Sequence, residues 1–432
     1  MHSVDEKRNK RINKLTLLFS EGNMDMDIVI PQAIELIEEY QSASAYNILA
    51  LAHKRLGNYT TAQDIYKKLL ISNPKNTMFL GNLGNIYNDI GMLEKAEECF
   101  KRTLEIDSKN FNIIISLGNL FATTGRLDEA LLSFNMILDA HDEITPAQLD
   151  DTNYRIAEVY RQKGDDFIDK AIQHFNLSNH PLSSAHRLEL IYKSKSKNIY
   201  CKAEKDINTK GELNPLLAAV QTHASIRYDI SDNNLFCKDP FKYIYHAKLT
   251  DKEGFNEALV DNLLAVKNRL SSTDQKLLYN GQQSAGDFLL SHDSSVKTIK
   301  NIILNRIKNY KNDHAHFSDG FIERWPENSI LHGWVIDIKK GGNIGSHMHK
   351  LGWLSGSLYL KLEKPPNSNQ GNIIFDLSGA SYPEDSKFFP SKEFNIEKGD
   401  IVLFPSSIFH KTVPLDSEEN RITLAFDVKP IF

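Results

Sequence analysis

A repeat with a period of 34 residues is the feature that most constrains the fold of this chain. Gly57, Gly91 and Gly125 are 34 residues apart. Three further sets of residues keep the same step: Leu49, Leu83 and Leu117; Ala62, Ala96 and Ala130; and Tyr66, Phe100 and Phe134. A fixed period of this length marks stacked copies of one supersecondary unit. The first part of the chain is therefore predicted to be a helical solenoid.

Each repeat is predicted to be a pair of helices. Apolar residues recur at helical spacing on both sides of Gly91, and this glycine suits the tight turn between the two helices. Small residues such as Gly84 and Gly118 allow neighbouring helices to approach closely, while bulky aromatic residues fill the space beside them. The pattern resembles the tetratricopeptide repeat (TPR) and covers at least residues 43–144.

The chain is predicted to have three parts. Residues 1–176 form the TPR array, whose last unit has Gly164 and Ala171 seven residues apart instead of five, which implies an insertion of two residues. Residues 177–235 are mostly polar and without a clear period, apart from one helical pattern at 214–228, and are predicted to be an irregular helical continuation or linker. Residues 236–432 form a second domain, with a strand core at about 330–432.

Composition excludes several classes of protein. A chain of 432 residues with 41% hydrophobic and 25% charged residues has an ordinary globular composition. Its 51 basic and 56 acidic residues do not indicate a nucleic-acid partner, and its apolar runs are too short for a membrane span. The three cysteines (Cys99, Cys201 and Cys237) are odd in number and widely spaced, so neither a disulfide framework nor a zinc motif is expected. We therefore expect a cytoplasmic protein.

The second domain begins with helical patterns and ends with strands. Residues 256–270 and 296–310 have the pattern of amphipathic helices that pack on the outside of a sheet. From about residue 330 the chain contains short apolar or alternating runs separated by Gly, Pro, Asn and Asp: LHGWVIDI, WLSGSLYLKL, GNIIFDL, DIVLFPSSIF and RITLAFDV. Five such runs predict an all-β sandwich or barrel.

The candidate metal-binding and catalytic residues lie among these strands. His347 and His349 are two residues apart, so their side chains are predicted to lie on the same face of a strand, and His410 ends a later strand. Arg421 and Thr423 also share one face, directed toward the barrel interior. A buried arginine requires an anionic partner, which is either a bound dicarboxylate or the carboxylate of Asp427 on the same face.

These residues together carry a family resemblance over roughly residues 320–432. The order His347-Met348-His349, SGSLYL, KGDIVLFPSSIF followed by His410, and Arg421-Ile422-Thr423 resembles the double-stranded β-helix (jelly-roll) of 2-oxoglutarate- and Fe(II)-dependent oxygenases, which include the prolyl hydroxylases. The resemblance implies that His347, His349 and His410 bind Fe(II), and that Arg421 and Thr423 bind the far carboxylate of 2-oxoglutarate. Tyr359 is a further candidate contact of this cosubstrate.

One ligand departs from the usual pattern of the family. The position that usually holds a carboxylate is His349, so the resemblance implies a metal site of three histidines. Imidazole suits Fe(II), and such a site is chemically reasonable. Asp376, in the strand IIFDL, is an alternative ligand that would supply the missing carboxylate.

The resemblance implies an enzyme that uses 2-oxoglutarate and O₂ to hydroxylate a C–H bond, with succinate and CO₂ as co-products. The attached TPR array favours a peptide or protein substrate or partner, because an extended groove suits such a ligand. Two alternatives remain open at this stage. One is a TPR interaction scaffold with a catalytically inactive, metal-binding barrel; the other is a three-histidine cupin-type dioxygenase that does not use 2-oxoglutarate.

Overall fold

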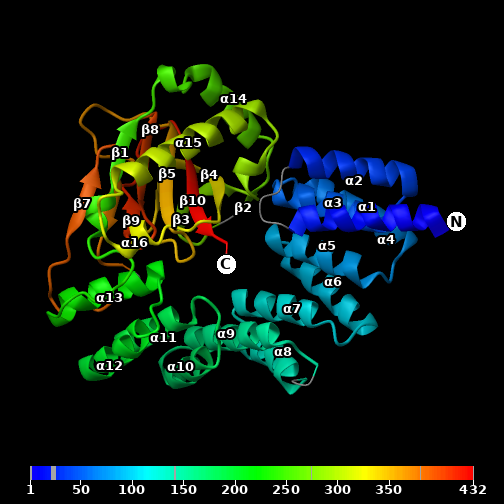
Figure 1. The fold of residues 1–432 in the computed structure, drawn as a ribbon, viewed down its shortest axis with the longest axis horizontal. Helices are drawn as coiled ribbons and strands as arrows, with labels where there is room; N and C mark the ends of the chain where they lie inside the picture. The colour runs from blue at the N-terminus through cyan, green and yellow to red at the C-terminus, as the bar shows by residue number, and fades with distance from the viewer. Residues whose placement is uncertain (1, 21–25, 141–142, 274, 380, 432) are drawn as a thin grey trace.

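An arc of helices leads into a domain built on two β-sheets (Figure 1). The computed structural model describes residues 2–20, 26–140, 143–273, 275–379 and 381–431. In chain order the helices of the arc are α1 (His2–Ser20), α2 (Met26–Tyr40), α3 (Ala43–Arg55), α4 (Tyr59–Ser72), α5 (Thr77–Asp89), α6 (Leu93–Ile106), α7 (Phe111–Thr123), α8 (Leu127–Asp139), α9 (Pro146–Lys163), α10 (Ile168–Asn176), α11 (Ser183–Ser194), α12 (Lys197–Asn208) and α13 (Pro215–Tyr228).

The 34-residue repeat corresponds to the helix pairs α3/α4, α5/α6 and α7/α8, as the sequence predicts. Gly91 and Gly125 lie in the turns within two of these pairs and have φ of +76° and +79°, a conformation that residues with a Cβ rarely adopt. The small residues have the predicted packing role. A Cβ at Gly118 would lie 2.5 Å from the ring of Phe134 in the next helix.

We expect Gly118→Ala to destabilise the array by about 1–3 kcal/mol, because the added methyl group overpacks a buried contact with Phe134. Alanine at an exposed helix position would instead stabilise the helix by about 1 kcal/mol relative to glycine. A decrease in the free energy of unfolding, measured in urea, therefore indicates that the added methyl group contacts Phe134. Asn112→Ala, at an exposed position of the same helix, is the control and should have little effect. A stabilising effect of Gly118→Ala would contradict the packing.

The predicted two-residue insertion lies between α9 and α10. Gly164, with φ of +95°, ends α9, and a short 3₁₀ helix at Asp165–Phe167 occupies the extra length before α10 begins. The buried Ala171 of α10 still packs in the same small apolar cluster as Ala157 of α9. The insertion therefore lengthens the turn and preserves the helix pairing.

Helices α11, α12 and α13 are regular, and α11 and α13 contact the β domain. Apolar side chains of α11 and α13, among them Leu188 and Leu216, share one buried cluster with Met348, Tyr382 and Phe409. The polar composition of 177–235 hides α11 and α12, whereas residues 214–228 have a helical pattern in the sequence that matches α13. The domain limits at 176 and 235 remain predictions, because this cluster is common to the last helices of the arc and to the β domain.

The first helices of the arc contact the β domain at a second place. The backbone N–H of Asp287 donates to the carbonyl of Arg55 at the end of α3, over 2.9 Å. Asp27 of α2 forms ion pairs with His292 and Lys297 of the β domain. The arc is thus joined to the β domain near both of its ends, as its course around that domain in Figure 1 suggests.

The β domain is a jelly-roll of antiparallel strands, as the resemblance implies. The larger sheet has the order β1-β8-β5-β10-β4-β3-β2, and the smaller one has the order β7-β6-β9. The strands are β1 (Tyr245–Lys248), β2 (Ser272–Thr273), β3 (Leu278–Ser284), β4 (Ser329–Ile344), β5 (Leu354–Lys361), β6 (Ile373–Asp376), β7 (Ser391–Phe394), β8 (Asp400–Pro405), β9 (Phe409–Thr412) and β10 (Arg421–Pro430). Strands β1, β2 and β3 precede residue 330 and lie outside the predicted strand core. In particular β3, LYNGQQS, has few residues that favour strands and is held by its pairing with β4.

Two helices, α14 (Glu257–Lys267) and α15 (Ser294–Asp313), match the two predicted amphipathic segments and cover the larger sheet. Ile422 and Leu424 of β10 pack in one apolar cluster with Leu263 of α14 and Ile303 of α15, which confirms that this face of β10 is covered. The alternate residues of β10 face the interior between the sheets.

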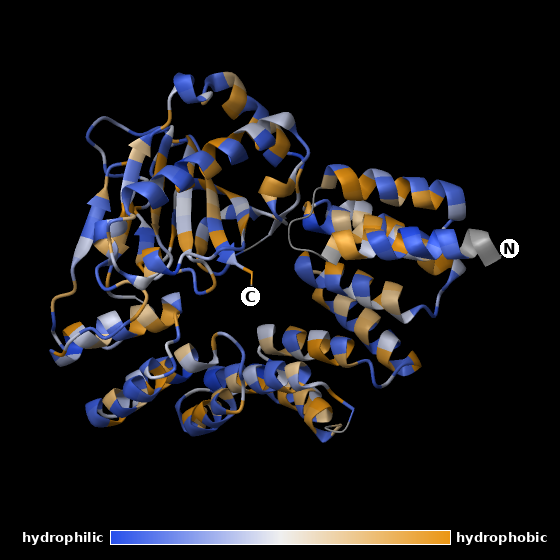
Figure 2. Ribbon diagram, viewed as in Figure 1, coloured by the Kyte–Doolittle hydropathy of each residue, from blue (hydrophilic) through white to orange (hydrophobic). Residues whose placement is uncertain are grey.

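In Figure 2 the helices of the arc show both hydrophobic and hydrophilic colours. Within the described ranges, no helix combines the length and the apolar character needed to cross a membrane.

Candidate metal and cosubstrate site

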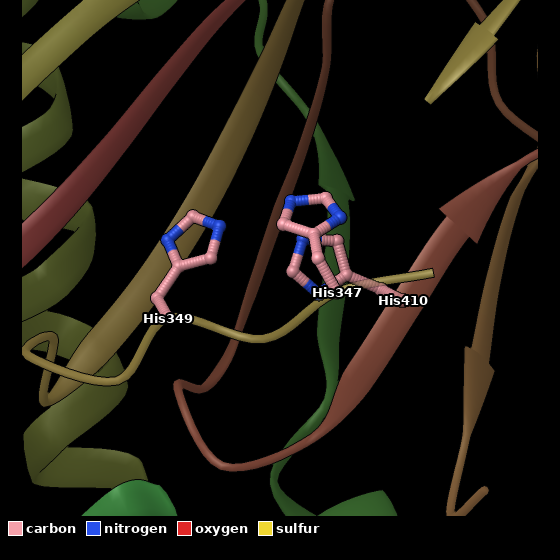
Figure 3. A group of neighbouring side chains, drawn as sticks. All are labelled: His347, His349 and His410. Atoms are coloured by element: carbon pink, nitrogen blue, oxygen red, sulfur yellow. The ribbon is translucent and has the colours of Figure 1, made fainter. Parts of the chain in front are cut away.

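Three histidines from two distant segments of the chain lie close together in the β domain (Figure 3). His347 and His349 follow β4, and His410 lies on β9. The backbones of His347 and His410 exchange two hydrogen bonds, with N···O distances of 3.0 and 2.8 Å. Each histidine offers one ring nitrogen, and these three atoms lie within 4.8 Å of one another. Such a group is able to bind one metal ion.

Each of the three rings has an acceptor beside its Nδ1 atom. Nδ1 of His347 lies 2.9 Å from the carbonyl oxygen of Gly345, and Nδ1 of His410 lies 3.3 Å from that of Ile408. Nδ1 of His349 lies 2.5 Å from Oδ1 of Asp427. These oxygens can only accept a hydrogen bond, so each ring is expected to carry its hydrogen on Nδ1 and to leave the lone pair on Nε2. Three imidazole lone pairs fit a first-row transition metal such as Fe(II).

Burial keeps the imidazoles of His347 and His410 neutral. It lowers the pKa of His347 to about 4, and the neighbouring His349 ring acts in the same direction. Burial also lowers the pKa of His410 well below its ordinary value. At neutral pH protons therefore do not compete with a metal ion for these two rings.

We expect the metal-free protein to lose stability as the pH falls from about 6.5 toward 4. In this window the unfolded chain binds a proton at His347 and the folded chain does not, so acid favours the unfolded state. Urea unfolding at pH 7 and pH 5 measures the effect, and His347→Gln should reduce the difference between the two. An unchanged difference in the variant would show that His347 does not contribute.

Asp427 is the acidic residue that the structure brings to the histidines. Its buried carboxylate accepts hydrogen bonds from His349 and from the Ser355 hydroxyl, the latter at 2.8 Å. Burial by itself would raise the pKa of this carboxyl, but the His349 ring and the two hydrogen bonds hold the pKa below its ordinary value. The alternation of β10 places Asp427 on the interior face, but the sequence carries no signal for its pairing with His349.

Asp376 does not join the histidines. Its carboxylate lies 3.6 Å from Nζ of Lys411 and accepts the backbone N–H of Ser378 at 2.8 Å. Its neighbour Phe375 is the residue of β6 whose ring approaches His410, with 6.1 Å between the ring centroids. The alternative with Asp376 as a metal ligand therefore has no support in the geometry of the described residues.

Arg421, at the start of β10, is buried without a partner for its charge. Arg421 is 2% exposed. Its Nε and Nη1 atoms have no hydrogen-bond acceptor in the described part of the chain. Oγ1 of Thr423 and the hydroxyl of Tyr359 are likewise buried and unpaired. The carboxylate of Asp427, the other partner considered for Arg421, is occupied by His349 and Ser355. An unpaired buried cation is costly, so this arrangement fits an anionic ligand.

One cavity of about 480 Å³ connects the two groups of residues. The three histidines, Arg421 and Thr423 line it together with Asp427 and Trp334. Tyr359 does not line this cavity, and its ring contacts Arg421, whose guanidinium carbon is 5.0 Å from the ring centroid. Leu182, between α10 and α11, also lines the cavity, as do Lys350 and Lys429. A residue of the helical arc therefore borders the same space as the histidines.

Family comparisons agree with both parts of the chain. A family model described as "Putative 2OG-Fe(II) oxygenase" matches residues 332–427, which include the three histidines, Arg421 and Thr423. Two tetratricopeptide-repeat models match residues 43–76 and 78–110. A search of curated proteins finds no relative that matches the chain.

Similar solved structures include tetratricopeptide repeat proteins and a prolyl hydroxylase. A tetratricopeptide repeat protein from Parabacteroides merdae ATCC 43184 is 15% identical, with 60% of this chain and 98% of that chain covered and a TM-score of 0.41. PilF of Pseudomonas aeruginosa is 16% identical over 48% of this chain and 92% of that chain, with a TM-score of 0.39. A prolyl-4-hydroxylase of Pseudomonas putida is 14% identical over 44% of this chain and 93% of that chain, with a TM-score of 0.30.

Proposed function

Because the chain carries tetratricopeptide repeats and a C-terminal 2OG-Fe(II) oxygenase domain, we propose that it is a 2-oxoglutarate- and Fe(II)-dependent hydroxylase that acts on a peptide or protein side chain. The observation that carries the proposal is the unpaired Arg421 in the same cavity as the three histidines. A metal site alone would also suit the two alternative functions, but a buried guanidinium at this place requires an anion.

His347, His349 and His410 are the proposed ligands of the metal. Their neutral rings hold the ion without supplying negative charge, and the backbone hydrogen bonds between His347 and His410 keep two of the ligands in a defined position. Fe(II), when bound with 2-oxoglutarate and O₂, supplies the oxidation of a substrate C–H bond to an alcohol, with succinate and CO₂ as co-products.

Arg421 and Thr423 are the proposed binding residues for the far carboxylate of 2-oxoglutarate. The guanidinium offers two N–H groups without a protein acceptor, which suits a carboxylate. The hydroxyl of Thr423 lies on the same face of β10 and is available as a further donor. Tyr359 pairs with Thr423 across the sheet, and its ring contact with Arg421 orients the guanidinium.

The walls of the cavity favour the binding of this anion by keeping water away from it. Ile373 and Phe404 are buried apolar residues that line the cavity beside the polar groups. In such surroundings a charged hydrogen bond is stronger than in water. The same walls protect a reactive site from side reactions with solvent.

A peptide or protein substrate is proposed because of the place of the TPR array. Tetratricopeptide repeats form extended surfaces that bind other proteins. Leu182 brings the end of the arc to the cavity, and the exposed Leu351 of the oxygenase domain lies at the same opening. A chain bound along the arc would thus reach the proposed metal site without crossing the molecule.

Turnover of 2-oxoglutarate tests this proposal most directly. Purified protein with Fe(II), ascorbate and 2-oxoglutarate is expected to form succinate slowly without a substrate, and to consume O₂ in step. Binding of metal and 2-oxoglutarate without any succinate would indicate an inactive scaffold. Binding of metal without affinity for 2-oxoglutarate would favour a cupin-type dioxygenase.

A further inference from the structure

The hydrogen bond between His349 and Asp427 distinguishes this histidine from the other two. His347 and His410 have backbone carbonyl oxygens beside Nδ1, which are neutral acceptors. His349 has a carboxylate there, with 2.5 Å between Nδ1 and Oδ1. Asp427 is 4% exposed, so little solvent screens its charge from the ring.

The carboxylate of Asp427 is held in place by a closed set of contacts. Ser355 donates to its Oδ1 atom at 2.8 Å, and the hydroxyls of Ser355 and Ser406 are 2.8 Å apart. The carbonyl of Ser406 in turn accepts the backbone N–H of His349 at 3.2 Å. A Cβ at Gly352 would lie 2.5 Å from Oγ of Ser406 and 3.3 Å from Cγ of Asp427, so this glycine leaves room for the contacts. Strands β5 and β10 and the turn after β8 therefore fix the orientation of one imidazole.

This arrangement has an electrostatic consequence for a three-histidine site. Three neutral ligands leave the charge of a divalent ion uncompensated, whereas a carboxylate that accepts Nδ1–H makes the imidazole a better donor at Nε2. We propose that Asp427 is a positioning residue of the metal site: through His349 it supplies the negative charge that a directly bound carboxylate would otherwise supply, and it fixes the ring with Nε2 toward the metal. This inference rests on the proposed function, since it takes the three histidines as the ligands.

Metal affinity of the apo protein tests the role of Asp427 without a need for turnover. Asp427→Asn keeps the shape of the side chain and removes its charge. We expect titration with Mn(II) or Co(II) to give an affinity about 10- to 100-fold lower than that of the wild type. The absorption bands of bound Co(II) are expected to shift as well, because the donor strength of His349 changes. A purely structural role for Asp427 would leave these bands unchanged.

Asp400→Asn is the matched control for loss of a buried charge. Asp400 is 5% exposed and, like Asp427, accepts a hydrogen bond from a histidine, with 2.9 Å between its Oδ2 and Nε2 of His246. It belongs to the same domain but does not line the cavity of the three histidines. We expect a loss of stability in this variant without a change in metal affinity.

A double-mutant cycle with His349→Asp tests whether Asp427 affects metal affinity through the His349 imidazole or only through its charge near the metal. With a carboxylate already at position 349, Asp427→Asn should leave the metal affinity unchanged or increase it. An equal loss in both backgrounds, or no loss in either, would overturn the inference. If the metal-loaded wild type binds no 2-oxoglutarate, the proposed function fails while the effect of Asp427 on the metal is still measured.

Discussion

Arg421→Ala is expected to weaken the binding of 2-oxoglutarate by roughly 30- to several-thousand-fold while metal affinity stays near that of the wild type. The loss of one partner from a buried, hydrogen-bonded charge pair costs about 2–5 kcal/mol, and each 1.4 kcal/mol is about tenfold in affinity. Arg421 is not within the group of metal-ligating atoms, so the metal should be unaffected. Calorimetric titration of Mn(II) into the apo protein, followed by titration of 2-oxoglutarate into the Mn(II)-loaded protein, measures both affinities without turnover.

Arg421→Lys is the graded control for this experiment. Lysine keeps the positive charge but loses the planar pair of N–H donors, so its affinity for 2-oxoglutarate should fall between those of the wild type and the alanine variant. The alanine variant also removes a buried charge that has no acceptor in the described protein, so its folding should not be impaired as it is when an ion pair is broken. Equal affinities of wild type and Arg421→Ala for 2-oxoglutarate would remove the main support for an oxygenase.

His410→Ala is expected to abolish stoichiometric metal binding. The loss of metal affinity should exceed the roughly 10- to 100-fold that is typical when a residue hydrogen-bonded to a metal ligand is changed. The substitution removes one of three ligand atoms, and the two neutral rings that remain should hold Fe(II) poorly. Metal content after dialysis, together with Mn(II) titration, measures the effect. His347→Ala should behave in the same way.

Two control variants test whether the metal is lost because the protein is destabilised and not because a ligand is missing. His410 is buried, so His410→Gln preserves most of the side-chain volume and should lose the metal without the cavity that alanine creates. His316→Ala removes an exposed histidine of the same domain and should keep full metal content. Stoichiometric metal in folded His410→Gln and His410→Ala would show that the ligand set is wrong.

The sequence by itself determined the features that depend on local periodicity. The 34-residue step of Gly57, Gly91 and Gly125 predicts the helix pairs, because each repeat contacts mainly its neighbours in the chain. The alternation of β10 predicts that Ile422 faces the covering helices and that Arg421 faces the interior, because successive side chains of a strand point to opposite faces. The H-x-H pair, the later histidine and the arginine also stand out in the sequence, because their order along the strands resembles that of a known family.

Only the tertiary structure decided which of these residues contact one another. Asp427 lies on the face of β10 that Arg421 occupies, and the sequence allows a pair between them. The carboxylate is instead bound by His349 of the loop after β4 and by Ser355 of β5. Helices α11 and α12 have no clear period in the sequence, and the buried cluster that they share with α13 is completed by Tyr382 and Phe409 of the β domain. Such contacts join residues far apart in the chain, and their choice depends on the packing of the whole molecule, for which no local pattern carries a signal.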